Sequence, residues 1–339
     1  MQNQETGFSP EEDSLGHKEV VVSSLSELRT LAVNARRGRG GPKAKPPDNL
    51  AGYLFLLPWL SGVVLFMLGP MLASLYLSFT KYNLLKSPLQ HPPDFIWFEN
   101  YAKMFADAEF WNSFRVTVQY VVISVPIQLA FALLLALFLD KGMRGLSIYR
   151  AIFYLPSLLG GSVAIAILWR QVFGKDGLVN MVLALFGIEG PGWISNPDYA
   201  LWTIIILHIW TFGSPMVIFL AGLRQIPDMY YEAAVMDGAG RLKQFRHITL
   251  PLLTPIIFFN LVLQIIFAFQ TFTQAYVVSG GTGGPAGSTM FYTLFLYKVG
   301  FLQYDMGYAS AMAWFLLLVI AVFTAVNFWF SKYWVFYDD

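Results

Sequence analysis

Six long apolar stretches, separated by polar segments, follow one another along the chain after residue 50. Each approaches or exceeds the roughly 20 residues that a helix needs to cross the hydrocarbon core of a bilayer. Prolines inside these stretches should produce kinks rather than breaks, because neighbouring helices can satisfy the freed carbonyls. We therefore predict an all-α, polytopic membrane protein with six transmembrane helices, near residues 51–79, 113–139, 151–169, 200–223, 251–279 and 308–331.

The segments outside these stretches differ in character. Residues 1–50 are polar, first acidic and then basic with Gly and Pro, which predicts a flexible tail before a transmembrane domain over 51–339. Two further segments, about 80–112 and 170–199, carry aromatic residues among Asn, Asp and Gly. Aromatic side chains suit the membrane interface, so we expect short amphipathic helices there.

Charge excludes some functions and orients the chain. Only 13% of the residues are charged and the net charge is +1, so nothing indicates a nucleic-acid partner. The absence of cysteine excludes disulfides and thiolate metal sites. Most of the 22 Lys and Arg residues fall in the tail and in alternate connecting segments, which predicts that both termini are cytoplasmic.

One polar segment between the fourth and fifth stretches, about residues 227–250, is unusual for so apolar a chain. Pro227 and Asp228 indicate a helix start with the aspartate as N-cap, and a short helix should continue to Met236. Gly238 and Gly240 then allow a turn that a Cβ would oppose. Its small side chains predict a docking surface, with an ordinary interfacial loop as the alternative.

The motif in this segment resembles that of a known family. The stretch "EAAVMDGAGRLKQFRHITLP" is similar to the coupling loop in the membrane subunits of binding-protein-dependent ABC importers. The stretches "FENYAKMFADAEFWNSF" and "GGPAGSTMFYTLFLYKVGF" resemble the carbohydrate-uptake class, the maltose and oligosaccharide permeases. The resemblance implies that the loop docks on a cytoplasmic ATPase subunit through Glu232, Ala233, Ala234, Asp237 and Gly238.

Polar side chains interrupt the fourth and fifth stretches without introducing charge. Gln264 and Thr271 are seven residues apart with Phe267 between them, so the three share one helix face. Amides and hydroxyls can bond the OH groups of a neutral sugar, and a ring can stack on its C–H surface. The alternative is hydrogen bonding between membrane helices, which the same residue types provide.

The family resemblance adds to this candidate site. Maltose-type permeases place their sugar contacts on the helices that flank the coupling loop. An alignment without gaps from "ITLP" matches that site in the fifth stretch, and more loosely in the fourth. Together with the polar pattern, the resemblance implies substrate contacts at Trp210, Thr211, Ser214, Gln264, Phe267, Ala268, Gln270 and Thr271. The maltose permease has extra helices and a large periplasmic insertion, so the saccharide, and whether the site lies in this subunit or its partner, stay open.

The resemblance implies a permease subunit that imports a sugar or oligosaccharide across the bacterial inner membrane by alternating access. Its partners would be a second homologous permease, two ATPase subunits, an extracytoplasmic solute-binding protein and membrane lipid. The chain itself would be no enzyme and hold no cofactor, with ATP and Mg bound by the ATPase subunits. Consistently, the glycine-rich stretch "GGTGGPAGST" at 280–289 lacks the lysine of a phosphate-binding loop.

Three other functions remain open. Uptake of a polar non-sugar such as glycerol phosphate would favour basic residues in the cavity, and none is visible in the fourth or fifth stretch. An ion-coupled carrier usually needs intramembrane carboxylates, whereas His208 is the one titratable residue away from the ends of the stretches. A membrane enzyme would need clustered His, Asp or Glu residues, but the four histidines are scattered.

Overall fold

The computed structural model describes residues 49–86, 92–141 and 145–336. The chain divides into two units, Met1–Gly69 and Pro70–Asp339. The tail predicted for residues 1–50 lies almost entirely outside the described residues.

The described part of the first unit is helical. It consists of α2 (Asn49–Val63), which contains Pro58, and a turn of π-helix, η1 (Val64–Leu68). Helical residues continue to Ser78, and Gly52–Ser78 is long and apolar enough to cross a membrane, with none of its most apolar window buried within the chain. Large side chains such as Phe55 and Phe66 are more than four-fifths exposed.

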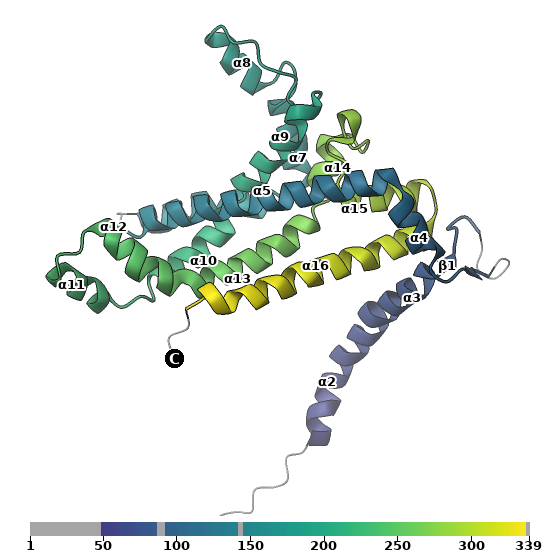
Figure 1. Cartoon of the computed structure of the whole chain (residues 1–339), viewed down its shortest axis with the longest axis horizontal. Coiled ribbons are helices and arrows are strands. Elements are labelled where there is room, and N and C mark those ends of the chain that lie inside the picture. Colours follow the sequence, from purple (N-terminus) through teal and green to yellow (C-terminus); the bar gives the residue numbers. More distant parts are fainter. Residues whose placement is uncertain (1–48, 87–91, 142–144, 337–339) are drawn as a thin grey trace, which may run out of the picture. The chain divides into compact units, whose positions relative to one another are not determined.

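The second unit contains the other predicted spans (Figure 1). Its elements, in chain order, are α3 (Gly69–Ser78), β1 (Thr80–Lys81), β2 (Asp94–Phe95), α4 (Glu99–Ala106), α5 (Ala108–Leu139), α6 (Leu146–Leu159), α7 (Val163–Val172), α8 (Leu178–Leu185), α9 (Pro197–Trp210), α10 (Gly213–Leu223), α11 (Asp228–Met236), α12 (Arg241–Gln244), η2 (Phe245–Thr249), α13 (Leu250–Phe269), α14 (Thr273–Val278), η3 (Pro285–Gly287), α15 (Tyr292–Tyr297), η4 (Lys298–Leu302) and α16 (Met306–Trp334).

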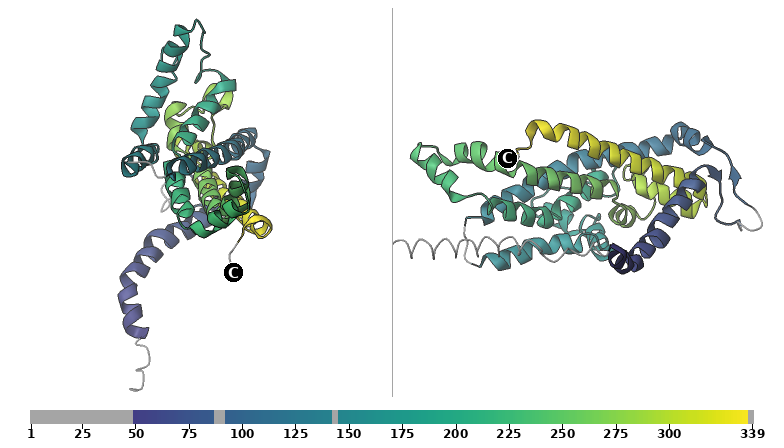
Figure 2. Two further views of the ribbon diagram at one scale, coloured as in Figure 1. Left: turned by 90° about the vertical axis from the view of Figure 1, so that its left-hand side faces the viewer. Right: turned by 90° about the horizontal axis from the view of Figure 1, so that it is seen from below.

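Helix α5 is the centre of this unit. It packs against α9, α10, α13 and α15, and α13 in turn packs against α16 (Figures 1 and 2). Its buried residues recur every three or four positions, as expected for a helix with one face in the core. That face includes the polar residues Ser113, Thr117, Ser124 and Gln128 besides large apolar ones. The core of the unit is therefore partly polar, and its hydrogen bonds have to be satisfied within the protein.

Helices occupy all six predicted spans. Four are continuous candidates for membrane helices: Gly52–Ser78, Ala108–Leu139, Arg241–Phe269 and Met306–Trp334. The third and fourth predicted spans are bent pairs, α6 with α7 and α9 with α10. Among the described residues, four helices are thus long and apolar enough to cross a membrane, or up to six when each bent pair counts as one span.

The expectation of kinks rather than breaks was wrong most clearly for the third span, and the fourth and fifth predicted spans are also interrupted, at Thr211 and Phe212 and at residues 270–272. Helices α6 and α7 meet at an angle of 95°, and the break lies at Gly160, Gly161 and Ser162. The hydroxyl of Ser162 then caps α7 by accepting from the backbone N–H of Ile165 at 3.3 Å. Pro126 and Pro255, in contrast, lie inside continuous helices. Two adjacent glycines followed by an N-cap serine, and not proline, end this helix and start the next.

The segments between the spans differ from the prediction in one detail. The short helices α4 and α8 confirm those expected within 80–112 and 170–199. However, β1 and β2 form a two-residue antiparallel pair, with Thr80 opposite Phe95, which a purely helical prediction omits.

The two bent pairs touch at glycines. A Cβ on Gly160 would overlap the Cγ2 of Thr211, at the break between α9 and α10. A Cβ on Gly213 would overlap the carbonyl oxygen of Phe153 in α6 and lie 2.7 Å from the Cα of Tyr154. These distances are too short for any side chain, so glycine allows the backbones of α6 and α10 to approach this closely.

We predict that Gly213→Ala destabilises the protein by about 1–3 kcal/mol, because the added methyl group meets backbone atoms that cannot move independently. The measurement is the temperature at which the purified transporter loses its monodisperse elution peak. Gly161→Ala is the matched control, since a Cβ there meets no atom within 4 Å among the described residues. Equal stability of the two variants would contradict the close approach of α6 and α10.

Candidate functional site

Three helix breaks surround one cavity. They are the break between α6 and α7, that between α9 and α10 at Thr211 and Phe212, and that between α13 and α14 at residues 270–272. The cavity has a volume of about 520 Å³. It is lined by Ser157, Gly160, Gly161, His208, Thr211, Ser214, Gln264, Phe267, Gln270, Thr271, Phe272, Thr273 and Gln274.

The lining is polar and uncharged. Five of its side chains are hydroxyls of Ser or Thr near the breaks, three are glutamine amides, and Phe267 and Phe272 supply rings; among these described lining residues only His208 is titratable. Phe267 is 59% exposed, although it lies on a helix of the core unit. Such a surface offers hydrogen-bond donors and acceptors beside aromatic faces, and it suits a neutral, hydroxyl-rich molecule.

Hydrogen bonds between helices hold the wall of the cavity. The amide of Gln274 donates to the carbonyl oxygen of Gly160 at 3.0 Å, so α14 satisfies a backbone group freed at the α6–α7 break. The hydroxyl of Thr293 donates to the carbonyl oxygen of Thr271. The hydroxyl of Thr271 lies 3.4 Å from that of Tyr120 on α5. The third break is therefore connected to α5, α15 and the first break.

His208 faces the cavity from α9 and is also part of the packing. Its ring lies edge-on to that of Tyr120, with centroids 5.4 Å apart. Its Nε2 atom is buried and has no hydrogen-bond partner among the described residues. The described residues contain no group of three or more His, Cys, Asp and Glu side chains placed to hold a metal ion.

The structure brings most of the predicted substrate contacts together. Thr211, Ser214, Gln264, Phe267, Gln270 and Thr271 all line the cavity. Two others do not line it: Trp210 lies beside Trp169, with ring centroids 5.9 Å apart, and Ala268 is fully buried in the core.

Sequence reasoning missed the contribution of the third span, Ser157, Gly160 and Gly161. The Gly160–Gly161 pair inside an apolar stretch was the available signal, because adjacent glycines weaken a helix.

The 227–250 loop forms the predicted helix, turn and helix at the end of the unit opposite α4 (Figure 1). Helix α11 ends in a Schellman motif: the N–H of Ala239 donates to the carbonyl of Ala234 at 2.8 Å, and that of Gly238 to Val235 at 3.0 Å. Gly238 has a φ of +73°, which favours glycine. The prediction for Gly240 was wrong, because its φ of −68° is open to any residue.

The start of α11 also differs from the prediction. Pro227 occupies the N-cap position and Asp228 is the first helical residue. No side-chain cap bond forms here among the described residues. The negative charge of Asp228 still favours the N-terminus of the helix through the helix dipole.

The surface of the 227–250 loop combines charged and large apolar side chains. Glu232, Ala233, Asp237 and Gly238 are exposed, whereas Ala234 is half-buried. Met236 and Leu242, which the sequence analysis did not single out, are 87% and 80% exposed. Helix α11 is also joined to the beginning of the helical segment Arg241–Phe269, since the hydroxyls of Tyr231 and Thr249 lie 2.9 Å apart. Exposed apolar side chains on an ordered loop are typical of a protein interface.

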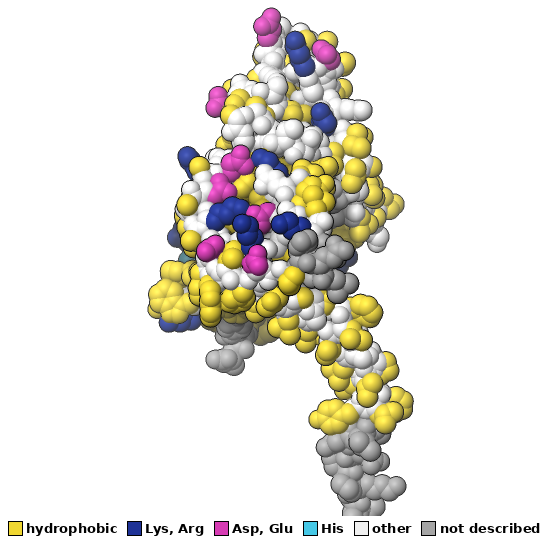
Figure 3. Space-filling view, turned by 90° about the vertical axis from the view of Figure 1, so that its right-hand side faces the viewer, with side chains coloured by type: hydrophobic (Ala, Val, Ile, Leu, Met, Phe, Trp, Pro, Cys, Tyr) yellow, Lys and Arg dark blue, Asp and Glu magenta, His cyan; other side chains and the backbone are white. Residues whose placement is uncertain are grey.

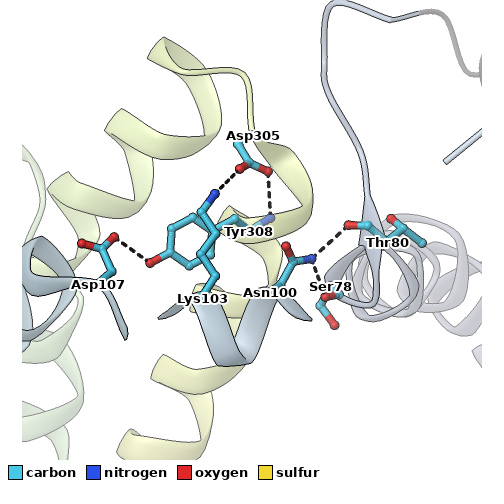
Figure 4. A network of polar contacts seen from close by, with 7 residues as sticks. All are labelled: Ser78, Thr80, Asn100, Lys103, Asp107, Asp305 and Tyr308. Carbon is cyan, nitrogen blue, oxygen red and sulfur yellow. Dashed lines mark hydrogen bonds and ion pairs between the residues drawn. The ribbon is translucent and has the colours of Figure 1, made fainter. Parts of the chain in front are cut away.

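The opposite end of the unit carries a polar network that connects α16 with α4, α5 and β1 (Figure 4). Lys103 forms an ion pair with Asp305 at 2.7 Å, and the hydroxyl of Tyr308 donates to Asp107 at 2.9 Å. The amide of Asn100 donates to the carbonyls of Ser78 and Thr80, both at 2.9 Å. Figure 3 shows Lys and Arg side chains interspersed with Asp and Glu at this end.

The sequence contained no local signal for this network, because Lys103 and Asp305 are about two hundred positions apart. The aromatic residues of the same segments predict a position at the membrane interface instead. The ion pair between Lys103 and Asp305 is exposed, so it adds little to stability by itself. Their effect is to fix the beginning of α16 against α4.

A helical, polytopic fold with a polar cavity at its helix breaks defines a membrane transport protein, and comparisons with known proteins agree. Residues 111–334 match the family of binding-protein-dependent transport system inner membrane components. The probable ABC transporter permease protein YesP of Bacillus subtilis is 50% identical over 294 residues, covering 86% of this chain and 94% of that protein. The lactose transport system permease protein LacF of Rhizobium radiobacter is 33% identical over 287 residues, covering 83% and 94%.

A solved structure shares the fold. It is the crystal structure of a bacterial alginate ABC transporter in complex with an alginate pentasaccharide-bound periplasmic protein, and one of its chains matches with a TM-score of 0.71. The identity is 22%, and the match covers 84% of this chain and 94% of that one.

The chain therefore belongs to the family of binding-protein-dependent transport system inner membrane components. It is a multi-pass permease of the inner membrane and works in a binding-protein-dependent ABC importer. It is the transport subunit and not an enzyme, and ATP is hydrolysed by a separate subunit.

The cavity geometry predicts a difference in reactivity between two adjacent positions on α13. The chain has no cysteine, so a single introduced thiol reports on its own site. A water-soluble thiol reagent should label Phe267→Cys about tenfold faster than Ala268→Cys, because reactivity follows exposure and the two native side chains are 59% and 0% exposed. Labelling is followed by mass spectrometry of the intact protein. Equal rates would contradict the orientation of α13.

Proposed function

We propose that this permease translocates a neutral saccharide, and that the cavity at the three helix breaks is its substrate site. The observation that carries the proposal is the lining: hydroxyls, amides and rings without Lys, Arg, Asp or Glu among its described residues. Sugars bind through such groups, because each OH needs a hydrogen-bond partner and the C–H face packs on a ring.

The names of the relatives support the same substrate class. Besides the lactose permease, the chain is 32% identical over 288 residues to the trehalose/maltose transport system permease protein MalF of Thermococcus litoralis, covering 84% of this chain and 94% of that protein. An arabinooligosaccharides permease of Bacillus subtilis, AraP, is 30% identical over 285 residues. Within our proposal Gln264, Gln270, Thr211, Ser214 and Thr271 bond the sugar and Phe267 stacks on it. Trp210 and Ala268 would act only as support behind the wall.

We further propose that both termini are cytoplasmic, as the distribution of Lys and Arg indicates, and that the 227–250 loop docks on an ATPase subunit. The exposed side chains of Glu232 and Asp237 and the exposed Met236 support this role. The importer would contain a second, homologous permease and two ATPase subunits beside the extracytoplasmic binding protein. ATP-driven closure of the ATPase dimer would move the loops and open the cavity to alternate sides of the membrane.

A phosphate-bearing solute such as glycerol phosphate is the second candidate. The uncharged lining disfavours it, because a phosphate is held best by Arg or Lys. The deciding experiment measures ATP hydrolysis by the complete transporter in liposomes, with its binding protein loaded from a panel of saccharides and glycerol phosphate. Stimulation by at least one neutral saccharide is expected, and stimulation by glycerol phosphate alone would show that the sugar assignment is wrong.

Phe267→Leu should slow saccharide uptake by about threefold to tenfold, because it removes the ring on which the sugar stacks while keeping an apolar side chain. Phe259→Leu is the matched control: Phe259 lies on the same helix and is 53% exposed, but it does not line the cavity. Uptake is measured with radiolabelled saccharide in proteoliposomes. If both variants slow uptake equally, the effect comes from α13 in general and the stacking role is excluded.

Gly238→Val should lower the amount of saccharide transported per ATP hydrolysed by about tenfold. A β-branched residue in the left-handed region costs roughly 1–2 kcal/mol and unwinds the turn. Gly240→Val, two residues later, is the control, since its φ of −68° accommodates any side chain and an added Cβ there meets no described atom within 4 Å. The readout is the ratio of sugar transported to ATP hydrolysed. An unchanged ratio for Gly238→Val would show that the 227–250 loop does not couple ATP hydrolysis to transport.

A further inference from the structure

The break between α9 and α10 leaves a backbone acceptor without its helical partner. In a continuous helix the carbonyl of Thr211 would accept from the N–H of residue 215. Residue 215 is proline, which has no N–H. An unsatisfied carbonyl inside a membrane protein costs several kcal/mol, so another group has to donate to it.

Ser157 on α6 meets part of this need. Its hydroxyl donates to the carbonyl oxygen of Thr211 at 2.8 Å and accepts from the backbone N–H of Ser214, also at 2.8 Å. One hydroxyl thus bridges the acceptor and the donor on the two sides of the break. Since Ser157 lines the cavity, this bridge is part of the substrate site itself.

Gln128 on α5 reaches the same break from the opposite side. It is 1% exposed and does not line the cavity. Its Nε2 lies 3.0 Å from the carbonyl oxygen of His208 and 3.1 Å from both the carbonyl and the hydroxyl oxygen of Thr211, so its two protons are shared among three acceptors. The two carbonyls also accept from other donors, whereas no other protein donor to the hydroxyl oxygen of Thr211 is found among the described residues.

The contact with the hydroxyl of Thr211 has a consequence for the cavity. That hydroxyl donates its own proton to the carbonyl of His208 at 2.7 Å. This bond directs the proton of Thr211 away from the cavity, and Gln128, by donating to the hydroxyl oxygen, occupies one of its two lone pairs, so that one acceptor position is left for a ligand. Without Gln128 the Thr211 hydroxyl would lose a donor while Ser157 still bridges the break, so the fold can persist with an altered surface.

We propose that Gln128 is a positioning residue that determines saccharide preference by fixing the hydroxyl of Thr211, although it touches no substrate. This inference rests on the proposed function, since it takes the cavity as the substrate site. A purely structural role would predict only that fewer transporters assemble. A positioning role predicts that the preference between sugars changes.

The test uses the complete transporter in proteoliposomes and two saccharides that both saturate the binding protein. The readout is the ratio of their maximal uptake rates, which a loss of assembled transporter does not change. Gln128→Met keeps the length of the side chain and removes the amide. We expect it to shift the ratio by between about twofold and tenfold, the range that one hydrogen bond supports.

A double-mutant cycle separates action through Thr211 from other effects. Thr211→Val removes the hydroxyl, and Gln128→Met added to it should leave the ratio of Thr211→Val unchanged. Ser124→Ala is the control on the same face of α5: Ser124 is fully buried, its hydroxyl has no partner among the described residues, and the ratio should stay at the wild-type value. Should Gln128→Met fail to assemble, Gln128→Asn, whose amide is too short to reach Thr211, replaces it with the same expectation.

Two results would overturn the proposal: uptake of both sugars falling in parallel, or effects of the two substitutions that multiply in the double mutant. Failure of the underlying function is distinguishable. If Thr211→Val and Phe267→Leu also leave the ratio unchanged, the cavity is not where sugars are discriminated. If those two variants shift the ratio and Gln128→Met does not, only the role of Gln128 is wrong.

Discussion

The requirement that backbone groups freed inside a membrane find partners within the protein governs this structure. The cavity of this protein lies at breaks in apolar helices, and each break leaves carbonyls and N–H groups without helical partners. Polar side chains of neighbouring helices meet that need. Gln274 reaches the break at Gly160, and Ser157 and Gln128 reach the break at Thr211. The site exists where three such breaks lie side by side.

This arrangement divides the polar residues of the spans into two groups. Gln128, Ser157 and Gln274 satisfy the backbone, and Gln128 does so from outside the lining. Gln264 and Phe267 line the cavity from the uninterrupted part of α13. Glycine makes the arrangement compact, since Gly213 allows α10 to contact the backbone of α6 and Gly160 leaves room for the side chain of Thr211. Polar side chains of the same type thus either bond a backbone group that a helix break has freed or line the cavity. Which of the two they do depends on whether a break lies within hydrogen-bond distance.

The 227–250 loop and the cavity are joined by one continuous helical segment. Arg241–Phe269 contains 29 residues, begins directly after the turn at Gly238 and ends at the cavity. At about 1.5 Å per residue such a segment is roughly 40 Å long, which is enough to cross a bilayer. The Tyr231–Thr249 contact ties α11 to the beginning of this segment. In the proposed coupling, a displacement of the loop would be carried along this segment to Gln264 and Phe267.

The six apolar spans, the helix and turn of the 227–250 loop and a polar face on the fifth span can be predicted from the amino-acid sequence, because each of these follows from local periodicity and residue type. The position of the break in the third span, the place of Ser157 and Gly160 in the cavity and the burial of Ala268 in the core emerge from the folded structure. It alone joined Lys103 to Asp305 and Gln128 to Thr211. The physical reason is that local preference determines whether a residue suits a helix. Which helix lies opposite, and so whether an amide satisfies a carbonyl or faces a cavity, depends on contacts between residues far apart in the chain.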